Sequence, residues 1–247
     1  MVASPVVEYL VGKKAEEIKP EFLAFLANLE VVSRVSPPVA KAVIDELEAQ
    51  RTNLKLIASE NYSSLSTQFA MGNLLTDKYA EGFPGHRFYA GCENVDAVES
   101  LAATEACKLF GCDHAYVQPH SGADANLVAY WAILSARVEM PALEDLGETN
   151  LSKLTAQQWE SLRVRMGNQR LLGMDYYSGG HLTHGYRNNV SARMFQAFTY
   201  TVDRDTGLLD YAAIEKQALE VRPLILLAGY SAYPRAINFR KMREIAD

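Results

Sequence analysis

From residue 93 onward, helical and extended patterns alternate along the chain, and this alternation constrains the fold more than any other feature. Apolar side chains recur at helical spacing over residues 98–109. Residues 114–118 are predicted to form a buried strand, and a helix is expected directly after it, over residues 122–134. A helix, a strand and a helix in this order indicate a parallel sheet with crossover connections, which is an α/β fold.

The same order returns toward the end of the chain. Strands are predicted over residues 195–202 and 224–228, with a helix over residues 211–219 between them and another from Asn238. Because helices again separate the strands, the pattern again indicates a parallel sheet.

Residues 135–169 interrupt this order. They are largely polar, and within them only residues 156–166 carry a helical pattern. We therefore predict an insertion on the surface of the domain. A decorated loop without a chemical role is the plainer interpretation of this segment.

The first 35 or so residues show weak periodicity. They are predicted to form an arm with a short helix over residues 20–29. A second helix is expected to open at Pro37, because proline is tolerated in the first helical turn. Residues 53–247 are predicted to form the α/β domain, which begins with a short extended run over residues 54–59.

The composition excludes several classes of protein. Hydrophobic residues make up 49% of the 247 residues and charged residues 22%, which fits a globular chain with a full core. The formal net charge of −6 gives no basic surface for nucleic acid. No apolar run approaches the roughly 20 residues that span a bilayer, and charged residues interrupt the start of the chain where a signal peptide would be apolar. The 3 cysteines form no CxxC pair, so we expect no disulfide framework or zinc site, and a cytoplasmic protein.

The turn before the helix at residues 122–134 has the features of an anion site. Ser121, Gly122 and Ala123 open that helix, where unpaired N–H groups and the positive end of the helix dipole face outward. Gly122 would let a ligand approach the backbone closely. These residues are therefore candidates for binding a phosphate, and a simple N-cap at Ser121 is the alternative.

Residues 179–185 combine three glycines with two histidines. His181 follows two of the glycines, and its ring can stack on a planar cofactor, bind a metal or simply pack. His184 lies three residues further on, but no acidic third ligand lies nearby in the sequence, so we expect no metal. Stacking on a cofactor and inert packing both remain open.

Glu81 is the candidate acid of the chain. It lies in a segment rich in glycine and aromatic residues, with Tyr79 and Tyr89 among its neighbours. Partial desolvation among these rings would favour the protonated carboxyl and prepare Glu81 for proton transfer. A solvated loop glutamate is the alternative.

Two serines lie where a small ligand is well placed. Ser59 ends the extended run at residues 54–59, and Ser231 follows the strand predicted at residues 224–228. Open α/β sheets bind ligands beyond the carboxyl ends of their strands. Both serines are therefore candidate ligand contacts, and capping is the alternative for Ser59.

Several of these segments, taken in order, form a specific set of motifs. They are Leu-Ile-Ala-Ser-Glu-Asn at 56–61, residues 78–85, Tyr-Ala-Gly-Cys-Glu at 89–93, residues 117–122, Gly-Gly-His-Leu-Thr-His-Gly at 179–185, Ser-Ala-Tyr at 231–233 and residues 241–247. With these motifs the chain resembles the serine hydroxymethyltransferase family from about residue 53 to its end. The insertion at about residues 135–169 is similar to that of chlamydial-type members.

The resemblance implies a fold, a reaction and an assembly. The fold would be the large domain of a fold-type I, aspartate aminotransferase-like enzyme that depends on pyridoxal 5′-phosphate (PLP), preceded by the arm at residues 1–52. The reaction would interconvert serine and glycine and transfer the one-carbon unit to tetrahydrofolate. The assembly would be a homodimer or a dimer of dimers, without nucleic acid or membrane.

The resemblance also implies which residues hold the cofactor. Ser121, Gly122 and Ala123 would bind the phosphate of PLP, and Tyr79 would reach it from a neighbouring subunit. His181 would stack on the cofactor ring.

Further residues are implied at the phenolic oxygen of PLP and around the substrates. Ser231 would hydrogen-bond near that oxygen. Ser59 would contact the carboxylate of the amino acid, together with Tyr79. Glu81 would move protons at the hydroxymethyl carbon and touch the folate, with Tyr89 beside it, and Glu81 and His181 would be the catalytic residues. The resemblance implies that Gly180 and Leu182 line the pterin pocket.

The chain departs from the family pattern in three ways. Phe88 stands where the family usually has the first of two tyrosines, and Tyr176 stands where many members carry a leucine at the folate pocket. The lysine that binds PLP covalently, the aspartate that pairs with its ring nitrogen, the carboxylate-binding arginine and the C-terminal small domain would all lie beyond Asp247. We therefore expect an incomplete large domain that is inactive alone and exposes a sheet edge.

Two other functions stay open. Another fold-type I PLP enzyme, such as a threonine aldolase, would need neither the wall formed by Gly180 and Leu182 nor the long aromatic loop. The second is a non-catalytic, truncated partner that binds the intact enzyme. A Thr-Thr-Thr-His-Lys run beyond Asp247 would favour the hydroxymethyltransferase.

Overall fold

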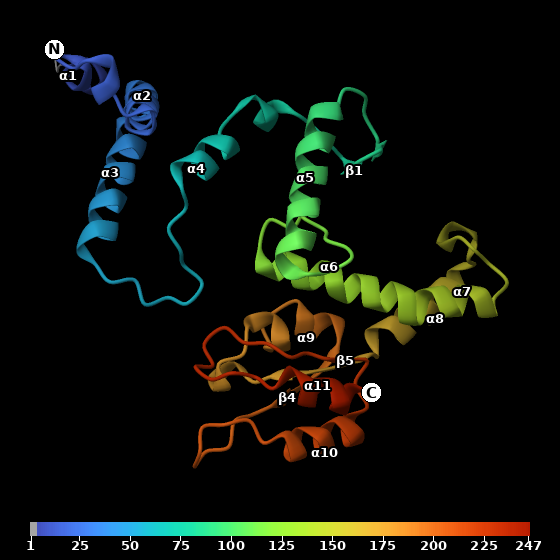
Figure 1. The fold of residues 1–247 in the computed structure, drawn as a ribbon. Coiled ribbons are helices and arrows are strands. Elements are labelled where there is room, and N and C mark those ends of the chain that lie inside the picture. The colour runs from blue at the N-terminus through green and yellow to red at the C-terminus, as the bar shows by residue number, and fades with distance from the viewer. Residues whose placement is uncertain (1–3) are drawn as a thin grey trace. The chain divides into compact units, whose positions relative to one another are not determined.

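The computed structural model describes residues 4–247. The chain divides into two compact units, Met1–Glu105 and Ala106–Asp247, and the candidate residues fall in both. Helix α5 (Glu93–Phe110) carries the chain across the boundary (Figure 1). No helix among the described residues combines the length and the apolar character that a bilayer crossing requires.

The first unit is mainly helical. Its helices are α1 (Pro5–Leu10), α2 (Pro20–Val35), α3 (Pro37–Thr52) and α4 (Leu65–Met71), with short 3-10 turns at Ala15–Glu17 and Leu74–Asp77. Each of the first three helices begins at a proline, whose missing N–H has no intrahelical partner to lose. Helix α1 packs against α2, and α2 against α3, as Figure 1 shows in blue. The helix expected over residues 20–29 therefore forms and runs on to Val35, and the helix at Pro37 is confirmed.

A short antiparallel hairpin carries the segment rich in glycine and aromatic residues. Its strands are β1 (Gly82–Phe83) and β2 (His86–Arg87), so the connection is Pro84-Gly85. Gly85 has a φ of +75°, and a proline followed by a residue with positive φ is what a type II turn requires. The local sequence thus specifies this turn by itself.

The second unit contains the parallel sheet. Its helices are α6 (Gly122–Leu134), α7 (Met140–Asp145), α8 (Ala156–Gly167), α9 (Ser191–Met194), α10 (Tyr211–Val221) and α11 (Phe239–Ala246). Its strands are β3 (Arg170–Met174), β4 (Gln196–Tyr200) and β5 (Ile225–Leu226). A π-helical turn, Ser135–Glu139, joins α6 to α7, and 3-10 turns lie at Leu151–Lys153, Tyr176–Ser178 and Leu182–His184.

The three strands are parallel in the order β4-β3-β5. Leu171 and Leu172 are adjacent in β3 and both fully buried, so they face opposite sides of the sheet. Leu171 joins a core cluster with residues of α6 and α8, whereas Leu172 joins one with residues of α10 and α11. Helices therefore cover both faces of the sheet, and the expected α/β fold is confirmed.

Two predicted extended segments are not strands. Residues 114–118 and 54–59 have irregular structure, and neither pairs with a strand of the described chain. A strand requires a hydrogen-bonded neighbour, which an apolar run does not supply by itself. The other predicted strands are confirmed, although the one at residues 224–228 is reduced to Ile225–Leu226.

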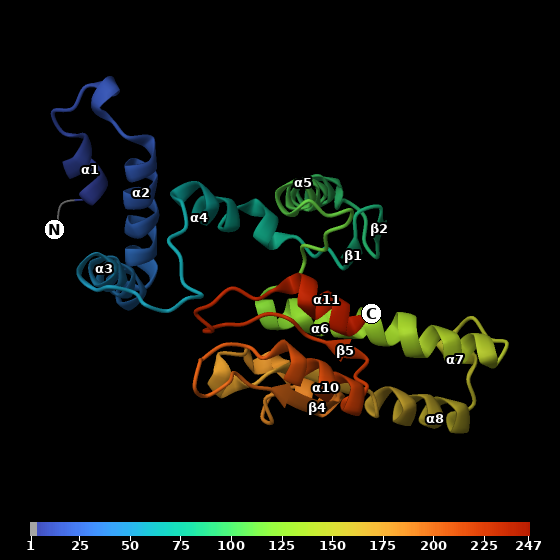
Figure 2. The ribbon, with the colours of Figure 1, turned by 60° about the horizontal axis from the view of Figure 1, so that its bottom comes forward.

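The predicted insertion is more ordered than a decorated loop. Helix α6 continues through the π-helical turn into α7, and α8 packs against the π-helical turn (Figure 2). Val138, Ala142, Leu162 and Met166 are buried in the cluster that also contains Leu171 of β3. The insertion therefore adds its own apolar side chains to one of the two core clusters.

Candidate functional site

The first turn of α6 forms as predicted. Ser121 lies outside the helix with extended backbone (φ −154°, ψ 164°), and its Oγ accepts the N–H of Asp124 at 3.0 Å. The N–H groups of Gly122 and Ala123 belong to the turn in which no intrahelical acceptor exists. A Cβ placed on Gly122 would meet nothing within 4 Å. Ser121 is thus an N-cap. Beside it, the space around Gly122 is open, and the N–H groups of Gly122 and Ala123 are available as donors.

The ring of His181 is held by Thr183. The backbone N–H of Thr183 donates to Nδ1 of His181 at 3.1 Å, and the hydroxyl oxygen of Thr183 lies 2.7 Å from the same nitrogen. The side-chain amide of Asn126 donates to that hydroxyl oxygen at 2.6 Å, which leaves the hydroxyl proton of Thr183 for Nδ1. Because Nδ1 accepts both bonds, the neutral imidazole carries its proton on Nε2.

Two side chains of helix α6, four residues apart, hydrogen-bond to Thr183 in the 3-10 turn Leu182–His184. Asn126 reaches the hydroxyl of Thr183, and the hydroxyl of Tyr130 donates to the backbone oxygen of Thr183 at 2.7 Å. Tyr130 is buried, and this burial raises the pKa of its hydroxyl to about 12. These contacts fix His181 relative to the helix that begins at Gly122.

His184 lies behind His181, with 6.1 Å between the ring centroids. The side chain is 4% exposed, and its Nδ1 is buried without a hydrogen-bond partner among the described residues. Burial, and secondarily the charge of His181, lowers the pKa of His184 from 6.5 to about 4. His184 is therefore neutral at physiological pH. A Cβ on Gly173 of β3 would come 2.9 Å from the backbone oxygen of His184, so glycine makes this packing possible.

Two glycines set the path of the chain from β3 to His181. Gly179 has a φ of +105°, and a Cβ there would lie 2.5 Å from the backbone nitrogen of Tyr233. A Cβ on Gly180 would lie 2.1 Å from the backbone oxygen of Met174. Neither position accepts a larger residue without a backbone shift.

Ser231 is tied to the same turn through the backbone. Its N–H donates to the backbone oxygen of Gly179 at 2.8 Å, and the N–H of Ala232 donates to the same oxygen at 2.9 Å. Ser231 follows β5 at its carboxyl end and is exposed. Leu182 is also exposed, whereas Gly180 is buried.

Tyr79, Glu81 and Tyr89 lie in the first unit, on a loop that Arg87 binds. The guanidinium of Arg87 contacts Asp96 at 2.8 Å, Glu99 at 2.6 Å and the backbone oxygens of Ala80 and Gly82. The hydrogen bonds and charges of the two carboxylates raise the pKa of Arg87, and the guanidinium lowers that of Asp96.

Glu81 does not have the environment that the sequence suggested. Its side chain is exposed, so the desolvation expected from the surrounding aromatic residues is absent in this structure. Tyr79 and Tyr89 are also exposed, and their rings meet edge to face with centroids 5.3 Å apart. Aromatic neighbours in sequence do not bury an acid unless other elements close over it.

Ser59 lines a shallow cavity of about 380 Å³ in the first unit, together with Lys55 and Glu60. Lys55 pairs with Glu46 at 3.1 Å and with Glu60 at 3.3 Å, which raises its pKa. Ser59 thus lines the same cavity as a lysine whose positive charge is already paired with two carboxylates.

Ser121, Gly122, Ala123, Gly180, His181, Leu182 and Ser231 lie in the second unit, and Ser59, Tyr79, Glu81 and Tyr89 lie in the first. Within the second unit, hydrogen bonds join α6 to Thr183 and Ser231 to Gly179. The sequence-based interpretation missed Asn126, Tyr130 and Thr183, which position His181. The i, i+4 spacing of Asn126 and Tyr130 on α6 was the available signal, since it places two hydrogen-bonding groups on one helix face. Within the described residues, no three His, Cys, Asp or Glu side chains gather to hold a metal ion.

Comparison with known proteins gives one consistent result. The family model for serine hydroxymethyltransferase matches residues 32–158 and 152–247. The serine hydroxymethyltransferase of Treponema pallidum (strain Nichols) is 66% identical over 239 residues, which are 97% of this chain and 42% of the relative. That of Mycolicibacterium smegmatis is 58% identical over 91% of this chain and 46% of the relative. That of Chlamydia trachomatis serovar D is 47% identical, with the same two shares. The chain thus spans less than half the length of these relatives.

Proposed function

Because the chain belongs to the serine hydroxymethyltransferase family, whose large domain has the fold-type I architecture of PLP enzymes, we propose that the whole protein interconverts serine and glycine. The one-carbon unit would pass to or from tetrahydrofolate. The substrates are therefore serine, glycine and a folate, and the proposed location is the cytoplasm.

The residues of the second unit fit PLP. The exposed first turn of α6 offers the N–H groups of Gly122 and Ala123 and the hydroxyl of Ser121 to a phosphate, in a place where a Cβ meets nothing. An anion at a helix N-terminus is favoured by these donors and by the helix dipole. When bound, PLP supplies an electron sink for the bonds at the α-carbon of an amino acid.

His181 would stack on the cofactor ring. The two hydrogen bonds to Nδ1 restrict the rotation of the imidazole, so the face it presents is set before any ligand arrives. Ser231, which is fixed through Gly179, would donate a hydrogen bond near the phenolic oxygen of the ring. Both residues would orient the cofactor, and His181 would act with Glu81 as a catalytic residue.

Further residues would bind the substrates. Ser59 would hydrogen-bond to the amino-acid carboxylate, and Gly180 and Leu182 would form the wall against the pterin. Glu81 would take and return a proton at the hydroxymethyl carbon, with the hydroxyl of Tyr89 beside it. An exposed carboxylate becomes an effective acid only when a ligand or a second subunit excludes water from it.

We further propose a homodimer or a dimer of dimers in which Tyr79 reaches the phosphate of the neighbouring subunit. The exposure of the Tyr79 ring (67%) supports this role, because a side chain that acts across an interface is free in the single chain.

The observation that carries the proposal is the hydrogen-bonded link from α6 through Thr183 to His181. It supports the proposal because it joins α6, whose first turn would bind the phosphate, to His181, which would stack on the ring.

The test is an assay of the complete product of the gene with PLP, serine and tetrahydrofolate. Glycine formation that depends on tetrahydrofolate, and that falls at least about 100-fold in the Glu81→Gln variant, is expected. Cleavage of threonine without any folate-dependent turnover of serine would instead identify an aldolase. Tight association with an active hydroxymethyltransferase, without any turnover of its own, would identify a non-catalytic partner.

A further inference from the structure

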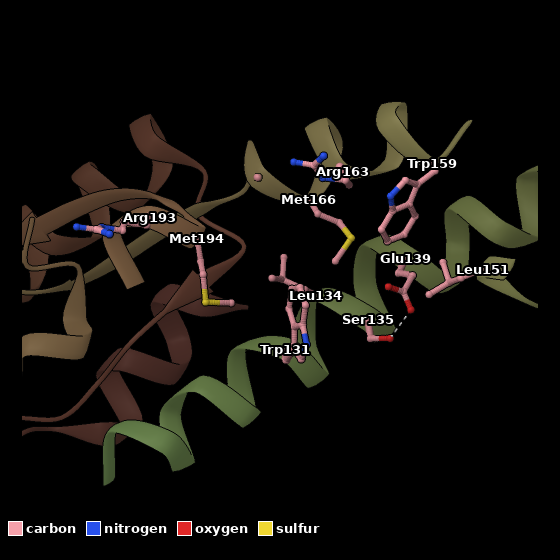
Figure 3. A pocket seen from close by; sticks show the side chains of 11 residues that line it. Trp131, Leu134, Ser135, Glu139, Leu151, Trp159, Arg163, Met166, Arg193 and Met194 are labelled. Atoms are coloured by element: carbon pink, nitrogen blue, oxygen red, sulfur yellow. Dashed lines mark hydrogen bonds between the residues drawn. The ribbon is translucent and has the colours of Figure 1, made fainter. Parts of the chain in front are cut away.

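A cavity of about 540 Å³ lies at the end of α6 that is remote from Gly122 (Figure 3). Its apolar wall is formed by Trp131 and Leu134 of α6, by Trp159 and Met166 of α8, and by Leu151 and Met194. Ser121 and Ser135 are separated by about 20 Å along the helix axis. None of the residues that line the cavity belongs to the first turn of α6 or to the turn around His181.

One charged group of this cavity lacks an opposite charge. The carboxylate of Glu139 is half-buried, and it accepts a hydrogen bond from the hydroxyl of Ser135 at 2.9 Å. No cationic side chain among residues 4–247 forms an ion pair with it at 4 Å or less. An ionised carboxylate that is partly removed from water is stabilised by a cation brought to it.

Two arginines also line the cavity, but neither pairs with Glu139. Arg163 pairs with Glu160 at 3.1 Å. Arg193 is exposed, and Figure 3 shows its guanidinium extending away from the two tryptophans. The cavity therefore combines two indole rings and methionine sulfur with a carboxylate that has no cationic partner.

The backbone beneath Glu139 is unusual as well. Ser135 and Glu139 are the first and last residues of a π-helical turn inserted between α6 and α7. Such turns are rare and occur frequently at functional sites, because they redirect side chains that a regular α-helix would place elsewhere. Here the two ends of the turn, Ser135 and Glu139, both line the cavity.

We propose that this cavity binds an organic cation, that is, a quaternary ammonium or protonated amine group carrying an apolar substituent. Indole faces attract cations through the ring quadrupole. The Glu139 carboxylate supplies the opposite charge, and the methionine and leucine side chains accept the apolar substituent. The site is separate from the proposed PLP site and does not depend on it.

Trp131 and Trp159 are the 2 tryptophans of the chain, so its intrinsic fluorescence reports on this cavity. The experiment titrates the chain with benzyltrimethylammonium, with neutral benzyl alcohol and with the anion phenylacetate. The cation should change the fluorescence saturably, with a Kd at least about tenfold lower than that of either other probe. Equal affinity for the three probes, tighter binding of phenylacetate, or no saturable change with the cation would overturn the proposal.

Three variants connect the result to Glu139. Glu139→Gln should weaken cation binding about tenfold, whereas Glu139→Asp, which retains the charge, should restore most of the affinity. Glu144→Gln is the matched control, because Glu144 is an exposed residue of the adjacent helix and is not part of the cavity wall. Circular dichroism establishes that each variant is folded. Unchanged affinity in folded Glu139→Gln would contradict the assignment.

Discussion

The hydroxyl oxygen of Thr183 lies 2.7 Å from Nδ1 of His181, and the same threonine determines through its backbone N–H which ring nitrogen of the histidine carries the proton. Since the backbone N–H of Thr183 donates to the same nitrogen, Nδ1 is an acceptor and Nε2 is the donor. Thr183 is 1% exposed, so water does not compete for these bonds. His181 is thus oriented by a buried neighbour, independently of any ligand.

Replacement of Thr183 by valine should remove the hydroxyl contact of His181, keep the bond from the backbone N–H, and leave the amide of Asn126 without its acceptor. An unsatisfied polar group of this kind costs about 1–3 kcal/mol of unfolding free energy. Thr183→Ser, which keeps the hydroxyl, is the control. Urea unfolding measures the effect, and equal stability of the valine and serine variants would contradict the assigned hydrogen bonds.

Gly180 and Gly122 should respond oppositely to alanine. In Gly180→Ala the new Cβ would meet the backbone oxygen of Met174 at 2.1 Å, and the backbone must move, so we expect a loss of about 3 kcal/mol or more. In Gly122→Ala the Cβ meets nothing within 4 Å, and stability should be retained or slightly raised. Thermal unfolding of the two variants is the measurement, and similar losses in both would be the contrary result.

The fold should lose stability in mild acid because of His184. Its pKa is about 4 in the folded chain, below its ordinary value of 6.5, since burial disfavours the charged ring. The neutral ring therefore contributes fully above about pH 6.5, and this contribution falls by up to about 3 kcal/mol as the pH decreases through 4. Urea unfolding between pH 7 and pH 4 measures it. The His184→Gln variant should show a shallower pH dependence, and an identical slope would count against this account.

Arg87 should control the order of the loop that carries Tyr79, Glu81 and Tyr89. Its side chain is 5% exposed and binds two carboxylates and two backbone oxygens at once, a geometry that the single ammonium of lysine does not reproduce. We expect Arg87→Lys to accelerate amide hydrogen exchange over residues 78–91. Arg34→Lys in α2, where the ion pair with Glu30 is solvent-exposed on the arginine side, is the control and should leave that exchange unchanged.

Local patterns predicted α6 to the residue, because Ser121 and Gly122 supply both the N-cap and the start of the helix. The helix at Pro37 was found because proline is tolerated in the first helical turn, whereas α1 was not predicted. Residues 114–118 were wrongly predicted as a strand, since pairing depends on a neighbouring strand that the local sequence does not encode. The order of residues 135–169 was not predicted. Val138, Leu162 and Met166 are buried because they pack in one cluster with Leu171 of β3, and the local sequence does not reveal this contact.

Some features of the candidate site could likewise be predicted from the sequence, and others could not. The glycines and histidines of residues 179–185 could be found from the sequence, because their composition is unusual in itself. Thr183 and Asn126 could not be paired, since 57 positions separate them and only the fold brings them together. The desolvation expected at Glu81 is absent, because exposure depends on what covers a loop and not on its neighbours in sequence.

The central claim is that the first turn of α6 and His181 together hold PLP, and calorimetric titration of the chain tests it most directly. The ligands are 4′-deoxypyridoxine 5′-phosphate, which lacks the aldehyde that reacts with surface lysines, and the same compound without phosphate. Gly122→Pro is the informative variant, because proline is favoured at the first helical position and Ser121 already has the extended backbone that precedes proline, so only the N–H is lost.

The account predicts that the phosphate strengthens binding at least about tenfold, and that Gly122→Pro removes most of this gain while leaving the phosphate-free ligand unaffected. Equal affinity for the two ligands, or an unchanged phosphate gain in Gly122→Pro, would contradict it.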